Sequence, residues 1–258
     1  MAAVNWYQLN GDNCTNCPLN MDETKKKYSL GNIELRFLCP SDLDEVRTLC
    51  QDWFPIEYPF YWYEEITSTT SRFYSLAAVY NQTIIGLIVA EIKPYSVLHG
   101  EDSGILAKCF VDNSDIGYIL SLGVLKEYRR NGVATLLLDS LLSYLTSNIR
   151  RKVKAVFLHV LTSNSAAIMF YEKRSFRLHS FLPYYYCIQG RCKDGFMYVH
   201  YINGGHGPWS IYDYIKFMCG KLARGGGFFP WLVDNMNRAI DWMWRRNECQ
   251  TENHQTLN

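Results

Sequence analysis

A six-residue run, Arg129-Arg130-Asn131-Gly132-Val133-Ala134, places two cations and a glycine between a predicted strand and a predicted helix. The apolar run 116–124 indicates a buried strand. After the run, apolar residues recur at helical spacing: Val133, Leu136, Leu137, Leu141 and Leu145. A small residue at such a turn leaves backbone N–H groups exposed at the helix start, where the helix dipole favours negative charge. The run therefore predicts a diphosphate site, although its spacing is neither the Walker pattern nor the three-glycine dinucleotide fingerprint.

Composition limits what kind of protein this is. The chain has 258 residues, 48% of them apolar, and Lys plus Arg exceed Asp plus Glu by only one (26 against 25). This near balance of positive and negative residues gives no overall positive charge of the kind that nucleic-acid-binding proteins use. Nine cysteines, an odd number, are scattered through the sequence, which fits a reducing compartment better than a disulfide framework. Cys14 and Cys17 form one C-x-x-C, which we interpret as two thiols in a polar extension, so no metal site is expected.

The first 30 residues are polar and lack a basic start followed by an apolar core, so they predict a flexible extension without a secretory signal. The uncharged run 73–90 is interrupted by Asn81-Gln82-Thr83, which resembles a hairpin turn. A membrane-spanning helix needs about 20 apolar residues in succession. The sequence therefore predicts a protein in the cytosol or facing it.

Periodicity predicts a mixed sheet with helices on its faces, because antiparallel strands come first and a strand–helix–strand–helix unit follows. Ser41 is a candidate helix N-cap, and the aromatic segment 53–63, with Pro55 and Pro59, is expected to form a loop. Residues 99–113 are a polar connection of unknown shape. The expected strands are 32–38, 73–80, 83–92, 116–124, 153–161, 176–182 and 196–202, and the expected helices start near residues 41, 61, 133 and 164.

The sequence from 206 to 246 follows an apparently complete sheet. It carries two apolar stripes at helical spacing, separated by Gly225-Gly226-Gly227 and flanked by tryptophans and cations. Amphipathic helices of this kind suit a bilayer interface, and we favour that interpretation. The alternative is that both stripes pack on the domain as ordinary core. Residues 247–258 are expected to be flexible.

Two signatures carry a resemblance to a known family. The R-x-x-G-x-A of residues 129–134 resembles the cofactor-binding motif of the GNAT acetyltransferases. The spacing of Asn164, Ala167, Phe170-Tyr171 and Phe176 is similar to a second signature of that superfamily. Ser175 stands where glycine is usual, and a left-handed residue at this helix end would be strained by roughly 1 kcal/mol. Further stretches between about residues 33 and 209 resemble the Golgi-associated N-terminal acetyltransferases.

The resemblance implies the GNAT fold of the α+β class, with a mixed, mostly antiparallel sheet splayed between its fourth and fifth strands. Acetyl-CoA would enter that gap. Backbone groups of Leu122, Gly123 and Val124 would then meet its pantetheine arm, and residues 130–135 would hold its diphosphate. Asn164 would bind the pantetheine or position a water, Tyr171 would protonate the leaving thiolate, and its neighbours would flank the cofactor. The cofactor-binding set is thus Leu122, Gly123, Val124, Arg130, Asn131, Gly132, Val133, Ala134, Thr135, Asn164, Tyr171, Glu172, Lys173 and Arg174.

The reaction is attack of an amine on a thioester, so the amine must lose a proton. The resemblance assigns this general-base work to Tyr118 and His159, acting through ordered water. By the period of two, Tyr118 should share a strand face with Leu120 and Leu122. From the residues alone, a satisfied core imidazole and a packed tyrosine are the favoured interpretations; only the family pattern reverses this preference.

Substrate recognition is expected from Phe54, Tyr58 and Leu120 on one side of a narrow apolar slot and from Tyr185 and Tyr186 on the other. Such a slot admits a flexible N-terminus but crowds out a lysine on folded backbone. The alternative is that residues 184–186 merely cover a sheet edge. An α-amine with a pKa of roughly 7.9 is also far more often neutral at pH 7 than a lysine near 10.4.

The leading hypothesis is therefore an N-terminal acetyltransferase, with acetyl-CoA as co-substrate, acting on proteins that retain Met1. Residues 31–205 would be the catalytic domain, and the tail would hold it on the cytosolic face of Golgi membranes, near transmembrane proteins with cytosolic N-termini. The alternatives are a lysine acetyltransferase, with histones as side substrates, and a membrane-bound acetyl-CoA-binding module with little catalysis.

Overall fold

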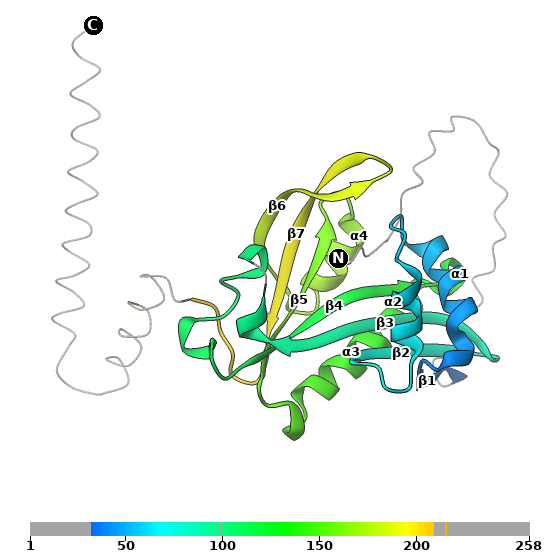
Figure 1. Ribbon diagram of the computed structural model, residues 1–258, viewed down its shortest axis with the longest axis horizontal. Helices are drawn as coiled ribbons and strands as arrows, with labels where there is room; N and C mark the ends of the chain where they lie inside the picture. Colours follow the sequence, from blue (N-terminus) through cyan, green and yellow to red (C-terminus); the bar gives the residue numbers. More distant parts are fainter. Residues whose placement is uncertain (1–31, 99, 209–214, 216–258) are drawn as a thin grey trace, which may run out of the picture. The chain divides into compact units, whose positions relative to one another are not determined.

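The structure, a computed structural model, describes residues 32–98, 100–208 and 215 (Figure 1). The predicted extension 1–30, the terminus 247–258, the C-x-x-C pair and all of the tail after residue 208 except residue 215 lie outside the described residues. The chain divides into a unit that ends at Pro208 and a second that begins at Trp209. In the part of the chain that is described, no helix combines the length and the apolar content that crossing a membrane requires.

Seven strands of the first unit form one sheet in the order β1-β2-β3-β4-β5-β7-β6. The strands are β1 (Glu34–Phe37), β2 (Phe73–Tyr80), β3 (Thr83–Pro94), β4 (Asp115–Val124), β5 (Val153–Leu161), β6 (Arg177–Ile188) and β7 (Arg191–Tyr201). The helices are α1 (Leu43–Trp53), α2 (Phe60–Thr67), α3 (Val133–Thr146) and α4 (Ser165–Glu172). Only β4 and β5 pair in parallel, and the other neighbours are antiparallel. The predicted mixed sheet is confirmed.

Helices cover both faces of this sheet. Val46, Cys50 and Trp53 of α1 and Trp62 of α2 belong to one apolar cluster. Leu137, Leu138, Leu141 and Leu145 of α3 belong to a second cluster, together with Ala167 and Tyr171 of α4. The central strands are apolar on both faces because each face is covered by a helix layer.

Three sequence-based boundaries need correction. Ser41 is not the N-cap: it lies in a 3₁₀ turn, Pro40–Asp42, and α1 follows at Leu43. The Asp42 carboxylate organises this start, because it accepts a hydrogen bond from the Cys39 N–H (2.9 Å) and pairs with Arg36 (2.6 Å).

The expected loop at 53–63 is also too long, since it is confined to residues 54–59. Pro59 immediately precedes α2, a position at which proline does not disrupt a helix.

The last two strands are longer than predicted. β6 and β7 extend into a hairpin whose turn is Gln189-Gly190. The polar, exposed residues of the hairpin tip gave no strand periodicity to detect. The connection of unknown shape contains the short 3₁₀ turns Gly100–Asp102 and Lys108–Phe110, with Ile105 fully buried between them.

Candidate active site

The two parallel strands β4 and β5 separate halfway along their length. Their pairing runs from Asp115 with Val153 to Ile119 with Leu158. Beyond that point β4 continues its pairing with β3 as far as Val124, and β5 continues with β7 as far as Leu161. The predicted splay between the fourth and fifth strands is therefore present, and it opens the sheet beside Leu120 and His159.

A bulge in β4 determines which side chains face this opening. Val89 pairs with Ser121 and Ala90 with Ile119, so Leu120 is an extra residue in β4. Tyr118 and Leu120 consequently lie in the cluster under α1 and α2, whereas Leu122 lies in the cluster under α3. The expectation that Tyr118 and Leu122 share a face is wrong, because an inserted residue shifts the two-residue alternation.

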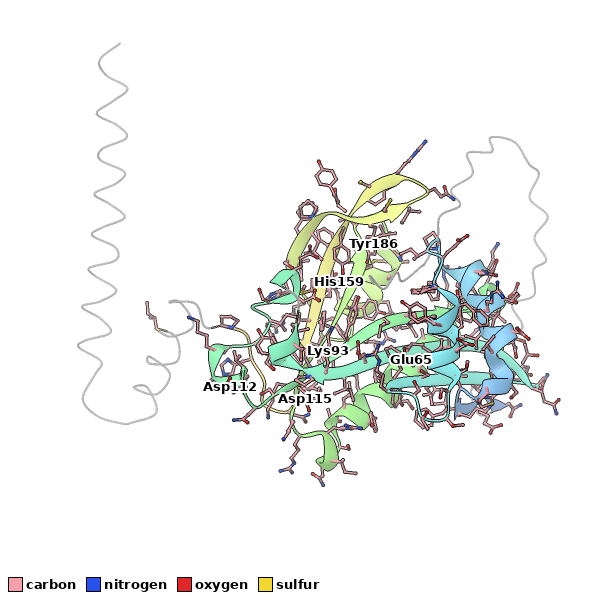
Figure 2. All side chains as sticks on the ribbon, in the orientation of Figure 1. Glu65, Lys93, Asp112, Asp115, His159 and Tyr186 are labelled. Carbon is pink, nitrogen blue, oxygen red and sulfur yellow. The ribbon has the colours of Figure 1, made fainter. Side chains whose placement is uncertain are left out.

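His159 is at the centre of a polar cluster in an otherwise apolar region. Its side chain is 0% exposed, and its Nδ1 lies 3.1 Å from the Tyr118 hydroxyl and 2.9 Å from the Tyr185 hydroxyl. On the other side of the ring, Nε2 lies 3.0 Å from Oδ1 of Asp102. Figure 2 labels His159 in the region where β5, β6 and β7 lie. The four side chains come from β4, β5, β6 and the turn Gly100–Asp102, so residues distant in sequence converge on one imidazole.

This arrangement gives each group a definite protonation role. The Asp102 oxygen is 3.0 Å from Nε2 without forming a hydrogen bond to it, and its negative charge favours the tautomer that carries the proton on Nε2. Nδ1 then has a single lone pair, which accepts the hydrogen of one hydroxyl at a time, that of Tyr118 or that of Tyr185. Burial raises the pKa of Tyr185, and the nearby Tyr118 and Asp102 raise it further, so Tyr185 stays a neutral hydroxyl. The cluster is built to accept a proton through a hydroxyl at Nδ1.

The Tyr118 ring is held firmly in place. It stacks on Phe157 with the ring centroids 4.6 Å apart and an interplanar angle of 14°. The Lys93 ammonium lies over the Tyr118 ring, 5.3 Å from its centroid. Stacking and cation–π contact fix the ring plane, and with it the direction of the hydroxyl.

A cavity of about 760 Å³ lies in front of the two tyrosines. Its wall includes Tyr118, Leu120 and Tyr185, but His159 is behind the wall rather than part of it. Tyr61 and Trp62 of α2 face the cavity as well. The wall also carries charged side chains: Glu65, Arg72, Glu91, Lys93, Glu101 and Asp102. The expected narrow apolar slot is in fact a wide cavity of mixed polarity, because these charges come from α2, β3 and the connecting turn.

The predicted substrate residues divide into two groups. Leu120 and Tyr185 line the cavity, whereas Phe54 and Tyr58 are buried in the core beneath α1 and α2. Tyr186 is almost fully buried and packs with Leu161 and Ile56. Phe54, Tyr58 and Tyr186 therefore support the wall from behind.

A second pocket, of about 450 Å³, lies at the start of α3. Here Gly132 is the residue before the helix, with a left-handed φ of 86°, and Arg130 is also left-handed at 61°. The first N–H groups of an α-helix have no partner inside the helix, and the residues of the first turn of α3 line this pocket. Three cations, Arg130, Lys173 and Arg174, line the same pocket. Donors and positive charge thus fit a diphosphate.

The pocket brings the segments of the two signatures together. Of the predicted cofactor residues, it is lined by Val124, Arg130, Gly132, Val133, Ala134, Thr135, Lys173 and Arg174. The rest lie outside its lining: Leu122, Gly123, Asn131, Asn164, Tyr171 and Glu172.

Several of these outlying residues have structural contacts. Asn164 caps α4 by accepting a hydrogen bond from the Ala167 N–H (3.1 Å). Glu172 accepts one from the Tyr198 hydroxyl (2.8 Å), which ties α4 to β7. Gly123 lies against Trp53, where a Cβ would come within 2.2 Å of the indole.

Sequence reasoning missed Asp102, Lys93 and the cavity-facing residues of α2. Asp102 lies in a connection whose shape had no periodic signal, so no spacing linked it to His159. Trp62 and Glu65 are three apart in the helix expected from about residue 61 and so share a face, but no sequence signal placed that face on the cavity. Arg129, part of the first signature, has a backbone role: its Nε donates to the Val124 carbonyl (2.9 Å) at the end of β4.

Comparisons with known proteins agree with this geometry. The family described as Acetyltransferase (GNAT) family matches residues 43–176. N-alpha-acetyltransferase 60 of Drosophila melanogaster is 51% identical, with 84% of this chain and 86% of that protein covered. The Danio rerio protein of that name is 52% identical, with 79% and 84% covered. The crystal structure of Arabidopsis thaliana NAA60 in complex with acetyl-CoA is 31% identical and has a TM-score of 0.60, covering 67% of this chain and 99% of that one. The chain therefore belongs to the GNAT acetyltransferase family, among its N-alpha-acetyltransferases, and is an acyltransferase.

Proposed function

We propose that the protein transfers the acetyl group of acetyl-CoA to the α-amine of proteins that retain Met1, followed by Leu, Ile, Phe, Tyr or Lys. The observation that carries this proposal is the pair of hydroxyls from Tyr118 and Tyr185, which lie on the cavity wall and meet the buried Nδ1 of His159. An amine bound in the cavity would reach the buried imidazole of His159 only through these hydroxyls.

Acetyl-CoA fits the second pocket by charge. Its diphosphate would accept hydrogen bonds from the first N–H groups of α3 and would lie near Arg130, Lys173 and Arg174. Gly132 lets the backbone approach the anion closely because it has no side chain. Bound there, acetyl-CoA supplies the thioester that the amine attacks.

The proton route follows from the contacts of His159. The attacking amine gives its proton to the Tyr118 oxygen as the Tyr118 hydroxyl proton moves to Nδ1 of His159. The imidazolium that forms is stabilised by Asp102, 3.0 Å from Nε2. The Tyr185 oxygen lies 2.9 Å from the same nitrogen, so it can accept a hydrogen bond from the Nδ1–H of the imidazolium and orient the ring. His159 acts through Tyr118 because its own side chain is fully buried.

Preference for an N-terminus rests on acidity and on the shape of the cavity. Roughly a tenth of an α-amine of pKa about 7.9 is neutral at pH 7, far more than for lysine near 10.4. Tyr61, Trp62 and Leu120 offer apolar surface to a methionine and a second apolar residue. The carboxylate of Glu101 would accommodate a lysine in the second position, whereas those of Glu65 and Glu91 pair with Arg72.

A pair of peptides tests this function. One peptide begins with free Met-Leu and contains an internal lysine, and the other is identical but blocked at its N-terminus. Acetyl transfer from acetyl-CoA is expected for the free peptide alone. Equal transfer to both would refute N-terminal specificity, and transfer to neither would favour an acetyl-CoA-binding module.

Lysine acetylation is the second candidate. The Arabidopsis thaliana protein named Histone acetyltransferase MCC1 is 29% identical to this chain, with 75% of the chain covered. The wide, acidic cavity would attract a lysine side chain electrostatically. The blocked peptide separates this activity from the first, since any acetyl group on it must be on lysine.

We further propose that residues 206–246 hold the enzyme on the cytosolic face of Golgi membranes, where transmembrane proteins with cytosolic N-termini are its substrates. The support is the sequence of the tail, with its apolar stripes, tryptophans and cations. Deleting residues 209–258 is expected to leave peptide acetylation intact and to release the protein into the soluble fraction. A truncated protein that still pellets with membranes would contradict the proposal.

A further inference from the structure

Two cysteines face each other across the last hairpin of the sheet. Cys187 of β6 and Cys192 of β7 are paired in register, and both are exposed free thiols. Directly opposed residues of an antiparallel pair have their side chains on the same face of the sheet. The two sulfur atoms are therefore neighbours on one exposed face.

The turn fixes this opposition. Gln189 and Gly190 both have positive φ, 50° and 72°, as a two-residue type I′ turn requires. The flanking pair is Ile188 with Arg191, so the cysteines form the next pair along, which is a non-hydrogen-bonded one. The Cα atoms of such a pair are about 4.5 Å apart, within the range of about 4.4–6.8 Å that a disulfide spans.

The hairpin tip joins the wall of the substrate cavity. The pairing of β6 with β7 is irregular between Leu182 and Tyr186, and Tyr184 has a φ of 55°. Beyond this irregular stretch the tip is held by the pairs that begin with Tyr186 and Lys193. A short two-stranded hairpin is only marginally stable by itself, so a covalent link at the cysteine pair would restrain the segment that carries Tyr185.

The other described cysteines lack this arrangement. Cys50 is buried, which raises the pKa of its thiol to about 12 and makes it unreactive. Cys39 lies beside the Asp42 carboxylate. Cys109 is exposed, in the turn Lys108–Phe110. Among the described residues there is also no group of three or more His, Cys, Asp or Glu that could hold a metal ion.

We propose that Cys187 and Cys192 are a reversible redox site, whose disulfide stiffens the cavity wall at Tyr185. With a small-molecule disulfide as oxidant, the two cysteine sulfurs join and give up two electrons. The oxidant's sulfur–sulfur bond breaks, and its two halves leave as thiols that carry the two protons. Exposed disulfides of this kind are easily reduced and are typical of regulation rather than of structural crosslinks.

The effect on catalysis rests on the proposed function. Because the oxidised wall is already ordered, it loses less conformational freedom when a peptide binds. The peptide KM is expected to fall roughly threefold on oxidation, as for ordering about one flexible side chain, while kcat is unchanged.

The covalent test is independent of activity. The full-length protein is equilibrated with mixtures of glutathione and glutathione disulfide, quenched with acid, alkylated and digested. A Cys187–Cys192 crosslink, lighter than the dithiol by two hydrogen atoms, is expected to appear as the mixture becomes oxidising and to vanish on reduction. Cys109→Ser should leave the crosslink unchanged, and Cys187→Ser should abolish it. Glutathione attached to Cys187 or Cys192 without a crosslink would overturn the proposal.

The kinetic test compares reduced and oxidised protein with the free Met-Leu peptide. A lower peptide KM in the oxidised wild type but not in oxidised Cys187→Ser supports the link to the cavity wall. A fully formed crosslink with an unchanged peptide KM would overturn that link. Absence of all acetyl transfer would count against the proposed function, whereas the redox site would still be judged by the mass measurement.

Discussion

Replacing Tyr118 by phenylalanine removes the hydroxyl that links the cavity to His159 and leaves the rest of the side chain in place. The ring is buried and stacks on Phe157 at 4.6 Å, and phenylalanine keeps that packing. The hydrogen bond to Nδ1, 3.1 Å long, contributes about 1 kcal/mol to stability, so the variant should fold. Losing general-base catalysis typically costs 10²–10⁴ in rate. Because the Tyr185 hydroxyl remains 2.9 Å from the same nitrogen, we expect kcat to fall at least tenfold, about 1.4 kcal/mol in the barrier.

The measurement is steady-state acetylation of the free Met-Leu peptide, with acetyl-CoA binding determined separately by calorimetry. Tyr144→Phe is the matched control, because its hydroxyl meets Arg150 near the end of α3, outside the cavity. If the proton passes from Tyr118 to His159, the double variant Tyr118→Phe/His159→Gln should be no slower than the slower single variant. Losses that multiply in the double variant would refute a shared route, as would an unchanged kcat in Tyr118→Phe.

Three further predictions concern stability. Ser175 has a left-handed φ of 64°, so Ser175→Gly should raise the free energy of unfolding by about 1 kcal/mol in urea denaturation; a decrease would contradict the strain argument. A Cβ at position 123 would lie 2.2 Å from the Trp53 indole, so Gly123→Ala should lower the melting temperature through about 1–3 kcal/mol of overpacking; an unchanged melting temperature would refute this. The hydrogen bonds from Arg36 lower the pKa of the Asp42 carboxyl. This contribution is therefore present above the unfolded pKa of about 3.9 and is lost as pH falls through the folded value, so the stability difference between wild type and Arg36→Met should shrink below pH about 4.

Most of the strand order along the chain could be predicted, because buried strands and amphipathic helices have strong periodicity. The bounds of β2 and β5 agree with their predicted ranges. Periodicity failed where local geometry departed from it. After the bulge at Leu120, the later residues of β4 lie on the opposite face of the sheet from the one that simple alternation predicts. The sequence does not reveal this shift, because the residues on both sides of the bulge are mostly apolar. The tip of β6 and β7 is polar on its exposed faces, so it resembled a loop.

Helix starts were predicted less well than helix bodies. Ser41 is a good capping residue by type. In the structure, however, the Asp42 carboxylate accepts the hydrogen bond from the Cys39 N–H and is held in place by Arg36. That pairing depends on β1 lying beside the start of α1. Residue type alone pointed to Ser41, whereas the helix start depends on the contact of Asp42 with Arg36 of another element.

The pocket at the start of α3 could be predicted from the sequence more fully than the cavity beside Tyr118, because its residues come from fewer segments of the chain. The diphosphate pocket is made of backbone N–H groups and cations from two short segments, each of which begins or ends a helix, so its residues stand in fixed spacing. The peptide cavity is made of side chains from α2, β3, β4, β6 and the connection before β4. Asp102 reaches His159 only because that connection turns back over the splayed strands, and no sequence spacing records such a contact. Variation in these loops can therefore change which N-terminus binds while the splayed strands and the diphosphate pocket stay the same.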